Sequence, residues 1–130
     1  MKKTILTVFA LILLSSTILM AVTKDKNNKN KTKPLVTFIE LGSVNCIPCK
    51  MMKPVMAEVE KEYGDKILVV FYDVNKDRQK TSDYKIRVIP TQVFLDKKGK
   101  EFFRHEGFFP KDELMKIVDK QLGIKRTEKK

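Results

Sequence analysis

The chain has 130 residues and a net charge of +11, with 27 lysines and arginines against 16 aspartates and glutamates. Most of the excess lies in the flanks, because residues 24–33 carry a net +4, residues 124–130 a net +3 and the two lysines near the start +2, which leaves only +2 for residues 34–123. A nucleic-acid-binding domain gathers positive charge on its folded surface, so this distribution argues against a nucleic-acid partner. The middle segment is long enough for one modest hydrophobic core.

The N-terminus has the pattern of an export segment. Two lysines precede an apolar stretch of 18 residues, Ile5 to Val22, and a membrane-spanning helix needs roughly 17 to 25 residues. Residues 1–22 are therefore either a cleaved signal peptide or an N-terminal membrane anchor. Residues 23–33 are polar and lysine-rich, which predicts a flexible basic linker, and residues 124–130 form a basic tail. We expect the folded domain to lie outside the cytoplasm, where disulfides form and persist.

Residues 34–123 alternate strand-like and helix-like patterns. Apolar, β-favouring runs indicate buried strands, and the segment after the first run shows an apolar face at spacings of three and four, which is typical of a helix. The order β-α-β-α-β-β-α predicts a four-stranded mixed sheet, in which the first two strands are parallel and a hairpin adds two antiparallel ones. The predicted elements are strand 35–41, a helix from the cysteines to Gly64, strand 67–72, helix 77–84, strands 91–95 and 100–103 joined by DKKG, and a helix from Pro110 to Gly123.

The two cysteines of the chain stand in the sequence NCIPCK, directly after the first strand. A purely structural disulfide would close a very short loop there and stabilise little. A zinc site needs four ligands, and His105 is the one histidine that could join the pair. The position favours a redox couple, because the N–H groups and dipole of a helix N-terminus stabilise a thiolate at Cys46, which is the attacking species in disulfide exchange. Cys49 follows one turn later, and we predict no metal and no cofactor.

Several motifs around this pair resemble the thioredoxin family. They are CIPCK after a buried strand, Pro54 five residues beyond the second cysteine, VIPT at Val88–Thr91 and Gly107 after the hairpin. The resemblance covers nearly all of residues 34–123 and implies a thioredoxin-like α/β fold. It also implies that the Ile89–Pro90 bond is cis and packs against the cysteines, and that Ile89, Pro90 and Gly107 border a groove for an extended substrate.

Glu40 lies six residues before Cys46, where thioredoxins carry a buried acid. Burial would raise the pKa of this carboxyl, which could then accept a proton from Cys49 during exchange. The alternative is an edge carboxylate that faces solvent.

Three features depart from the family. Asn45 replaces a tryptophan and Ile47 a glycine, the run at 67–72 lacks the family's lysine near the buried acid, and the usual first strand and helix have no counterpart before Leu35. The domain is thus expected to be a shortened thioredoxin.

The resemblance implies a thiol–disulfide oxidoreductase, and the N-terminal pattern of residues 1–22 predicts that it acts outside the cytoplasm. We expect a monomeric reductase of disulfides in exported proteins, tethered to the membrane and recharged by a membrane electron donor, because the loop resembles that of reducing thioredoxins and the helical insertion of disulfide-forming oxidases is missing. The alternatives are a non-catalytic thioredoxin-like binding module, and an oxidase or isomerase of the disulfides of exported proteins.

Overall fold

The computed structural model describes residues 33–126. These residues exclude the predicted signal peptide or anchor and nearly all of the predicted linker. The expected absence of the family's first strand and helix concerns the same segment and stays a prediction. Within the described part of the chain, no helix has both the length and the apolar character needed to cross a membrane.

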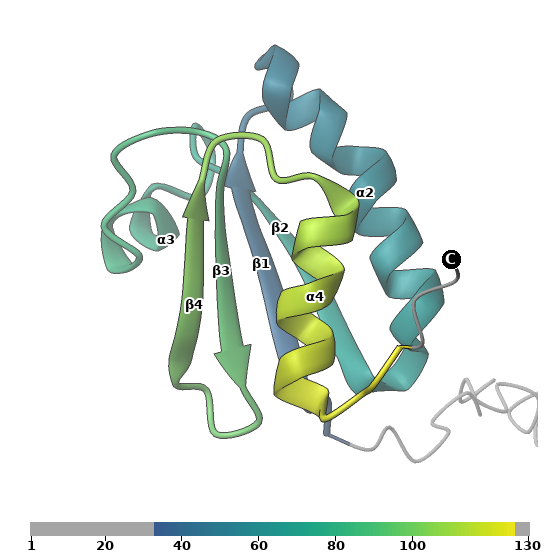
Figure 1. Ribbon diagram of the computed structural model, residues 1–130. Coiled ribbons are helices and arrows are strands. Elements are labelled where there is room, and N and C mark those ends of the chain that lie inside the picture. Colours follow the sequence, from purple (N-terminus) through teal and green to yellow (C-terminus); the bar gives the residue numbers. More distant parts are fainter. Residues whose placement is uncertain (1–32, 127–130) are drawn as a thin grey trace, which may run out of the picture. The chain divides into compact units, whose positions relative to one another are not determined.

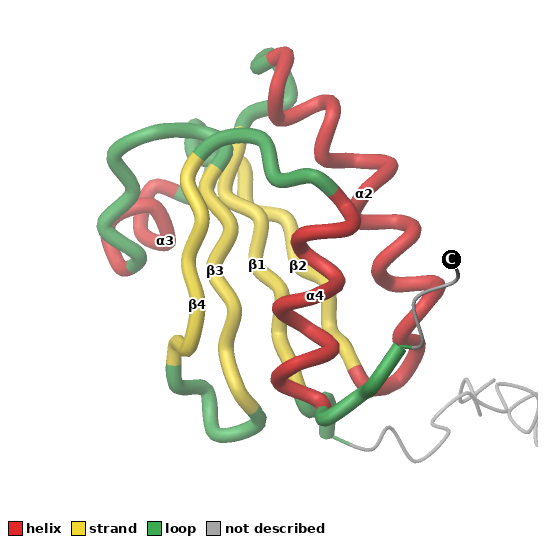
Figure 2. The backbone as a smooth tube through the Cα atoms, viewed as in Figure 1, coloured by secondary structure: helices red, strands yellow, loops and turns green. Residues whose placement is uncertain are grey.

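The described residues form a four-stranded mixed sheet with helices on both faces (Figures 1 and 2). The strand order is β2-β1-β3-β4, with β1 parallel to β2 and antiparallel to β3, and with β3 and β4 as an antiparallel hairpin. This confirms the predicted order of elements and the mixed sheet. The elements are β1 (Val36–Gly42), α2 (Ile47–Tyr63), a 3-10 turn (Gly64–Lys66), β2 (Ile67–Asp73), α3 (Arg78–Asp83), β3 (Thr91–Asp96), β4 (Glu101–Glu106) and α4 (Lys111–Leu122).

Strand β4 is longer than predicted. Its last three residues are Arg104, His105 and Glu106, whose polar side chains interrupted the apolar pattern of the sequence. The pairing with β3 nevertheless continues to Glu106, which lies opposite Thr91. A strand at the edge of a sheet tolerates polar side chains, so hydrophobicity alone placed its end too early.

The two faces of the sheet bury separate sets of apolar residues. Successive side chains on a strand point to opposite faces, so Phe38 of β1 packs beneath α2 and α4, whereas its neighbour Ile39 packs on the α3 side. The rings of Phe38 and Phe94 stack with their centroids 4.8 Å apart in the larger core. Members of that core include Val36, Met52, Val55, Val59, Tyr63, Ile67, Phe109, Leu114 and Val118.

Helix α2 carries the cysteines and turns its predicted apolar face to the sheet. Met52 is fully buried and accepts a hydrogen bond from the backbone N–H of Phe109, 3.4 Å from its sulfur, so it is a core residue, as expected. The helix continues through Pro54, which lies on the exposed side. It ends at Gly64, which has a φ of about +50° and a ψ of about −130°, a positive-φ conformation that glycine adopts at low cost.

A buried polar cluster ties α4 to α2. Asp119 is buried in the last turns of α4 and accepts a hydrogen bond from the Tyr63 hydroxyl at 2.8 Å. Arg126 donates to Asp119 and also to Glu62. The periodicity of α4 did not single out Asp119 as buried, because its burial depends on a tyrosine 56 residues earlier.

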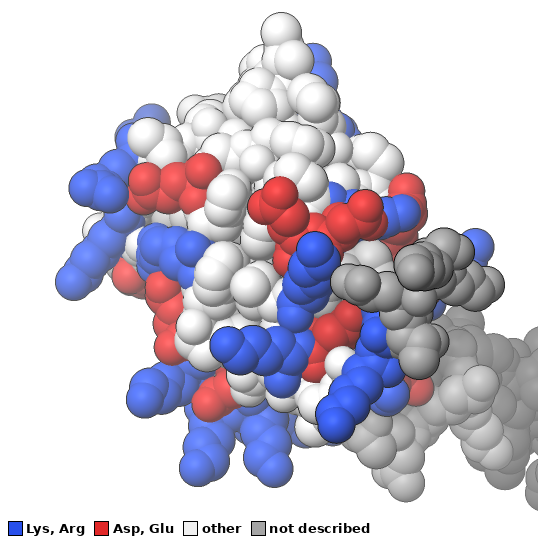
Figure 3. Space-filling model, viewed as in Figure 1, with Lys and Arg blue, Asp and Glu red and all other residues white. Residues whose placement is uncertain are grey.

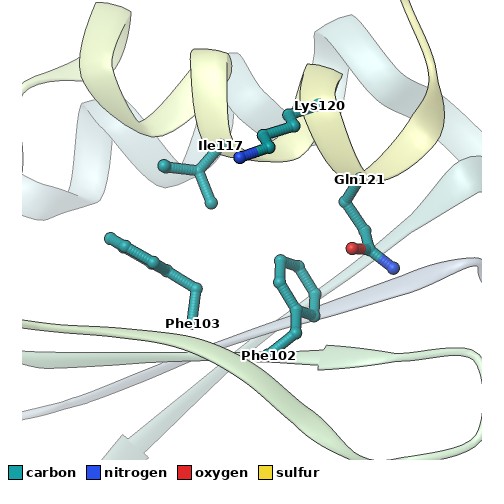
Figure 4. A pocket seen from close by; sticks show the side chains of 5 residues that line it. All are labelled: Phe102, Phe103, Ile117, Lys120 and Gln121. Carbon is teal, nitrogen blue, oxygen red and sulfur yellow. The ribbon is translucent and has the colours of Figure 1, made fainter.

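A depression of about 310 Å³ lies between β4 and α4. Figure 4 shows Phe102 and Phe103 rising from β4 toward Ile117, Lys120 and Gln121 of α4. An irregularity in the pairing with β3 places both phenylalanines against the same core, as a β-bulge does. The lining residues include no thiol, carboxylate or imidazole, so this depression adds nothing to cysteine chemistry.

Candidate active site

Four chain segments meet at one end of the sheet (Figure 1). Strand β1 ends there and leads into α2, β3 begins there after Pro90, and β4 ends there before Gly107. Candidate residues that lie far apart in the sequence are thus brought to one end of the domain.

The two cysteines lie at the start of α2. Cys46 is the N-cap residue, and its sulfur accepts the backbone N–H of Cys49 at 3.3 Å. The two residues form a disulfide, with Cα atoms 5.2 Å apart. Cys46 is partly exposed, whereas Cys49 is only 2% exposed, so the two sulfurs differ in their access to a partner.

The turn before Cys46 is braced by Ser43 and Asn75, two residues that the sequence did not single out. The hydroxyl oxygen of Ser43 accepts hydrogen bonds from the Asn45 N–H at 3.3 Å and from the Asn75 side-chain amide at 3.0 Å. Ser43 is buried, and the Asn75 contact links this turn to the segment after β2. The sequence held one indication of this bracing role. A serine between a strand and a helix often hydrogen-bonds to the backbone of the turn.

Cys49 packs directly on the end of β1. A Cβ atom added to Gly42 would lie 3.1 Å from the Cys49 sulfur and 3.2 Å from its Cβ. The absence of a side chain at Gly42 therefore makes room for the buried sulfur of Cys49.

The Ile89–Pro90 peptide bond is cis, as the resemblance implied. The Thr91 hydroxyl donates to the Val88 carbonyl at 2.8 Å, and the Gly107 N–H donates to the Pro90 carbonyl at 2.8 Å. Gly107 has a φ of +94°, where a side chain would be strained. The structure thus brings Ile89, Pro90 and Gly107 together.

Glu40 is fully buried on β1, which rules out the solvent-facing alternative. It lies on the same face as Phe38 and two residues before Gly42, against which Cys49 packs. Burial raises the pKa of its carboxyl to about 8, and the Gln92 amide offsets a smaller part of that rise. Neither carboxylate oxygen makes a hydrogen bond of regular geometry within residues 33–126, so the Gln92 amide acts on the carboxyl from close by without such a bond.

The surface around the disulfide is largely uncharged. In Figure 3 the end of the molecule at the top, where α2 begins in Figure 1, is mostly white. Ile47, between the cysteines, is 74% exposed. The other large apolar side chains exposed on the segments that meet at this end are Val44, Met51, Val88 and Phe108.

His105 does not approach the cysteines as a ligand would. Its ring stacks on Phe109 with the centroids 4.1 Å apart, and its Nε2 lies 3.2 Å from the Phe108 carbonyl oxygen. Among the described residues, no group of three or more histidine, cysteine, aspartate or glutamate side chains is placed to hold a metal ion.

The N-capping Cys46 is disulfide-bonded to the buried Cys49, and the segments that meet at this end of the sheet also carry a cis-proline bond and a buried acid. Together these features define a CxxC thiol–disulfide site. Residues 22–122 match the family model described as a thioredoxin-like domain. Thioredoxin of Bacillus subtilis (strain 168) is 34% identical over 105 residues, which cover 79% of this chain and 100% of that protein. Thioredoxin of Staphylococcus aureus is 30% identical over the same length and coverage.

Solved structures give the same result. A mutant thioredoxin from Halobacterium salinarum NRC-1 superposes with a TM-score of 0.61 at 26% identity, over 68% of this chain and 75% of that one. The germline-specific thioredoxin Deadhead from Drosophila melanogaster gives 0.62 at 25% identity, over 70% and 84%. The chain belongs to the thioredoxin family and is a thioredoxin-like thiol–disulfide oxidoreductase with a Cys46–Cys49 pair.

Proposed function

We propose that this protein is an extracytoplasmic reductase of disulfides in exported proteins. The observation that carries the exchange chemistry is the unequal exposure of the two cysteines at the N-terminus of α2, with Cys46 reachable from solvent and Cys49 buried; the direction of exchange rests on separate features. One sulfur can meet a bulky protein disulfide, while the other is held where only an intramolecular attack reaches it.

In the reducing direction, the Cys46 thiolate attacks one sulfur of the substrate disulfide. A mixed disulfide forms, and the other substrate sulfur leaves as a thiolate. Cys49 then loses its proton and attacks the Cys46 sulfur, which releases the second substrate thiolate and forms the Cys46–Cys49 disulfide. The helix N-terminus stabilises the attacking thiolate.

Glu40 is proposed as the acceptor of the Cys49 proton. The carboxyl lies on the same face of β1 as Gly42, the residue on which Cys49 packs. With a pKa of about 8, it exchanges protons near neutral pH, which is what a general base needs.

Ile89, Pro90 and Gly107 are proposed to dock the substrate. Within residues 33–126, the backbone N–H and C=O of Ile89 take part in no hydrogen bond, whereas Pro90 and Gly107 bond to each other. An extended substrate segment could pair with the free backbone of Ile89 as an added strand does. The exposed apolar side chains around the disulfide suit the apolar segments of an incompletely folded substrate.

Two features support a reductase rather than a strong oxidase. The loop between the cysteines holds Ile47 and Pro48, so it offers no histidine to stabilise the thiolate further. The fraction of Glu40 that is ionised, which grows as the pH approaches its pKa of about 8, would also disfavour a second negative charge. A thiolate that is stabilised only moderately makes the disulfide less easily reduced.

The reduction potential tests this direction. The reference values are about −270 mV for thioredoxin and about −120 mV for a strong periplasmic oxidase, and we expect the couple to lie near the first. Equilibration of the oxidised protein with glutathione or dithiothreitol buffers, read by alkylation of free thiols, gives the midpoint. A midpoint near about −120 mV would contradict the reductase proposal and leave the oxidoreductase class intact.

The extracytoplasmic location rests on the two N-terminal lysines and the apolar stretch from Ile5 to Val22. We expect the full chain to reach the far side of the membrane, where it would need a membrane electron donor to be reduced again. A C-terminal reporter that is active only after export should be active on the native chain. Leu13→Arg, which adds about 3 kcal/mol to the insertion of an apolar segment, should silence it. Equal reporter activity in both chains, or none in either, would contradict the proposal.

A further inference from the structure

Gln92 is a completely buried amide on a face of the sheet whose other buried residues are mostly apolar. It lies on β3 directly opposite Glu40 of β1, and both side chains are completely buried. Directly opposed residues of an antiparallel pair have Cβ atoms about 5 Å apart and share one face of the sheet. Burying an amide costs free energy unless it is hydrogen bonded, so its presence here calls for a partner.

Only one end of this amide has a partner. The Gln92 Nε2 donates to the Gly107 carbonyl at 3.1 Å, whereas its Oε1 and both oxygens of Glu40 have no hydrogen-bond partner within the described residues. Three buried acceptor oxygens thus lie on two opposed side chains without a donor. Protonation of Glu40 would supply a donor, because a neutral carboxyl can donate a hydrogen bond to the Oε1 of Gln92.

Few other polar groups approach this position. The titratable groups that register and packing bring nearest on this face are Cys49 from α2, Asp73 at the end of β2 and His105 from β4, which lies opposite Gln92. Asp96 and Tyr63 share the face farther along it. The β2 residue opposite Glu40 is Phe71. On α4 the buried carboxylate, Asp119, is engaged with Tyr63.

We propose that Gln92 is a positioning residue for proton transfer at the disulfide: it links the Glu40 carboxyl to the Gly107 carbonyl and can hydrogen-bond to that carboxyl in either protonation state. Its Oε1 accepts from the neutral acid, and the second N–H of its Nε2 faces the carboxylate after ionisation. An aliphatic side chain could do neither. The inference rests on the proposed role of Glu40 as proton acceptor and adds a link to the loop that docks the substrate.

Gln92→Met tests it, because methionine has a similar length and no amide. We expect the midpoint of the Glu40 carboxyl, followed by ¹³C NMR in the oxidised protein, to move to higher pH by about one unit. Resolution of a preformed mixed disulfide on Cys46 should then become about tenfold slower at neutral pH, since one unit of pKa is a tenfold change in equilibrium. The rate should recover at higher pH, and Gln92→Asn, which keeps an amide, should restore part of it.

The matched control is the same substitution in a Glu40→Gln background, where no shift in the pH profile is expected. A Glu40 midpoint that stays unchanged in Gln92→Met, or an equal slowing in both backgrounds, would overturn the proposal. If Gln92→Met does not fold, the wild-type protein still gives an answer: the Gln92 side-chain amide resonances should titrate with the same midpoint as the Glu40 carboxyl. The NMR readout does not depend on reductase activity, so failure of the proposed function and failure of this inference can be told apart.

Discussion

Replacing Cys49 with serine should stop turnover and leave substrate proteins covalently attached to Cys46. Cys46 keeps its exposed position and its place at the start of α2, so the first attack still takes place. The buried thiol that resolves the mixed disulfide is gone. Insulin reduction should fall to the uncatalysed background, and non-reducing gels should show adducts that dithiothreitol removes.

The matched variant is Cys46→Ser, which should be equally inactive but should trap nothing, because Cys49 is only 2% exposed. Both variants lose a small disulfide loop, which stabilises the oxidised protein by about 2 kcal/mol. Reduced wild-type protein is therefore the proper reference for folding. Adducts on Cys46→Ser instead of Cys49→Ser would reverse the assignment of the two thiols. Normal substrate binding with no insulin reduction by the wild type would favour a non-catalytic binding module.

The second large effect is expected in the stability of Glu40→Gln as a function of pH. The carboxyl has a pKa of about 8 in the folded protein and 4.5 as its ordinary value. The stabilising contribution of the protonated form is thus complete below pH 4.5 and is lost as the pH rises through about 8. At about 1.4 kcal/mol per unit of pKa, the free energy of unfolding of the wild type should fall by about 4 to 5 kcal/mol across this window, whereas glutamine removes that slope.

Urea unfolding of both oxidised proteins at pH 4.5, 6, 7 and 8 measures this difference. The oxidised form is used so that the thiols do not titrate. Glu60→Gln, on the exposed side of α2, is the control and should follow the wild type throughout. Parallel pH curves for wild type and Glu40→Gln would show that Glu40 titrates normally, and the proton-acceptor proposal would then lose its support.

The element order and the disulfide pair could be predicted because both follow from local patterns. A buried strand and an amphipathic helix leave periodicities of about 2 and 3.6 residues in the sequence, and the N-terminus of α2 follows from the change between them. These local patterns are sufficient to place the cysteines at the start of the helix. The prediction for β4 was too short because it depended on the same kind of pattern. The last residues of this edge strand are polar, so the alternation of apolar and polar side chains stops before the strand does.

The surroundings of the disulfide depend on contacts across the sheet and between distant segments. Glu40 and Gln92 lie far apart in the sequence, and the register of β1 with β3 makes them opposite neighbours. Nothing local shows that Gly42 leaves room for the Cys49 sulfur. The side-chain pattern reports which face of an element is buried, while strand register and chain packing decide which groups share that face. The sequence could therefore name the redox pair, its class of chemistry and, through the family resemblance, a buried acid at Glu40, whereas the tertiary structure alone placed the buried Gln92 amide opposite that acid.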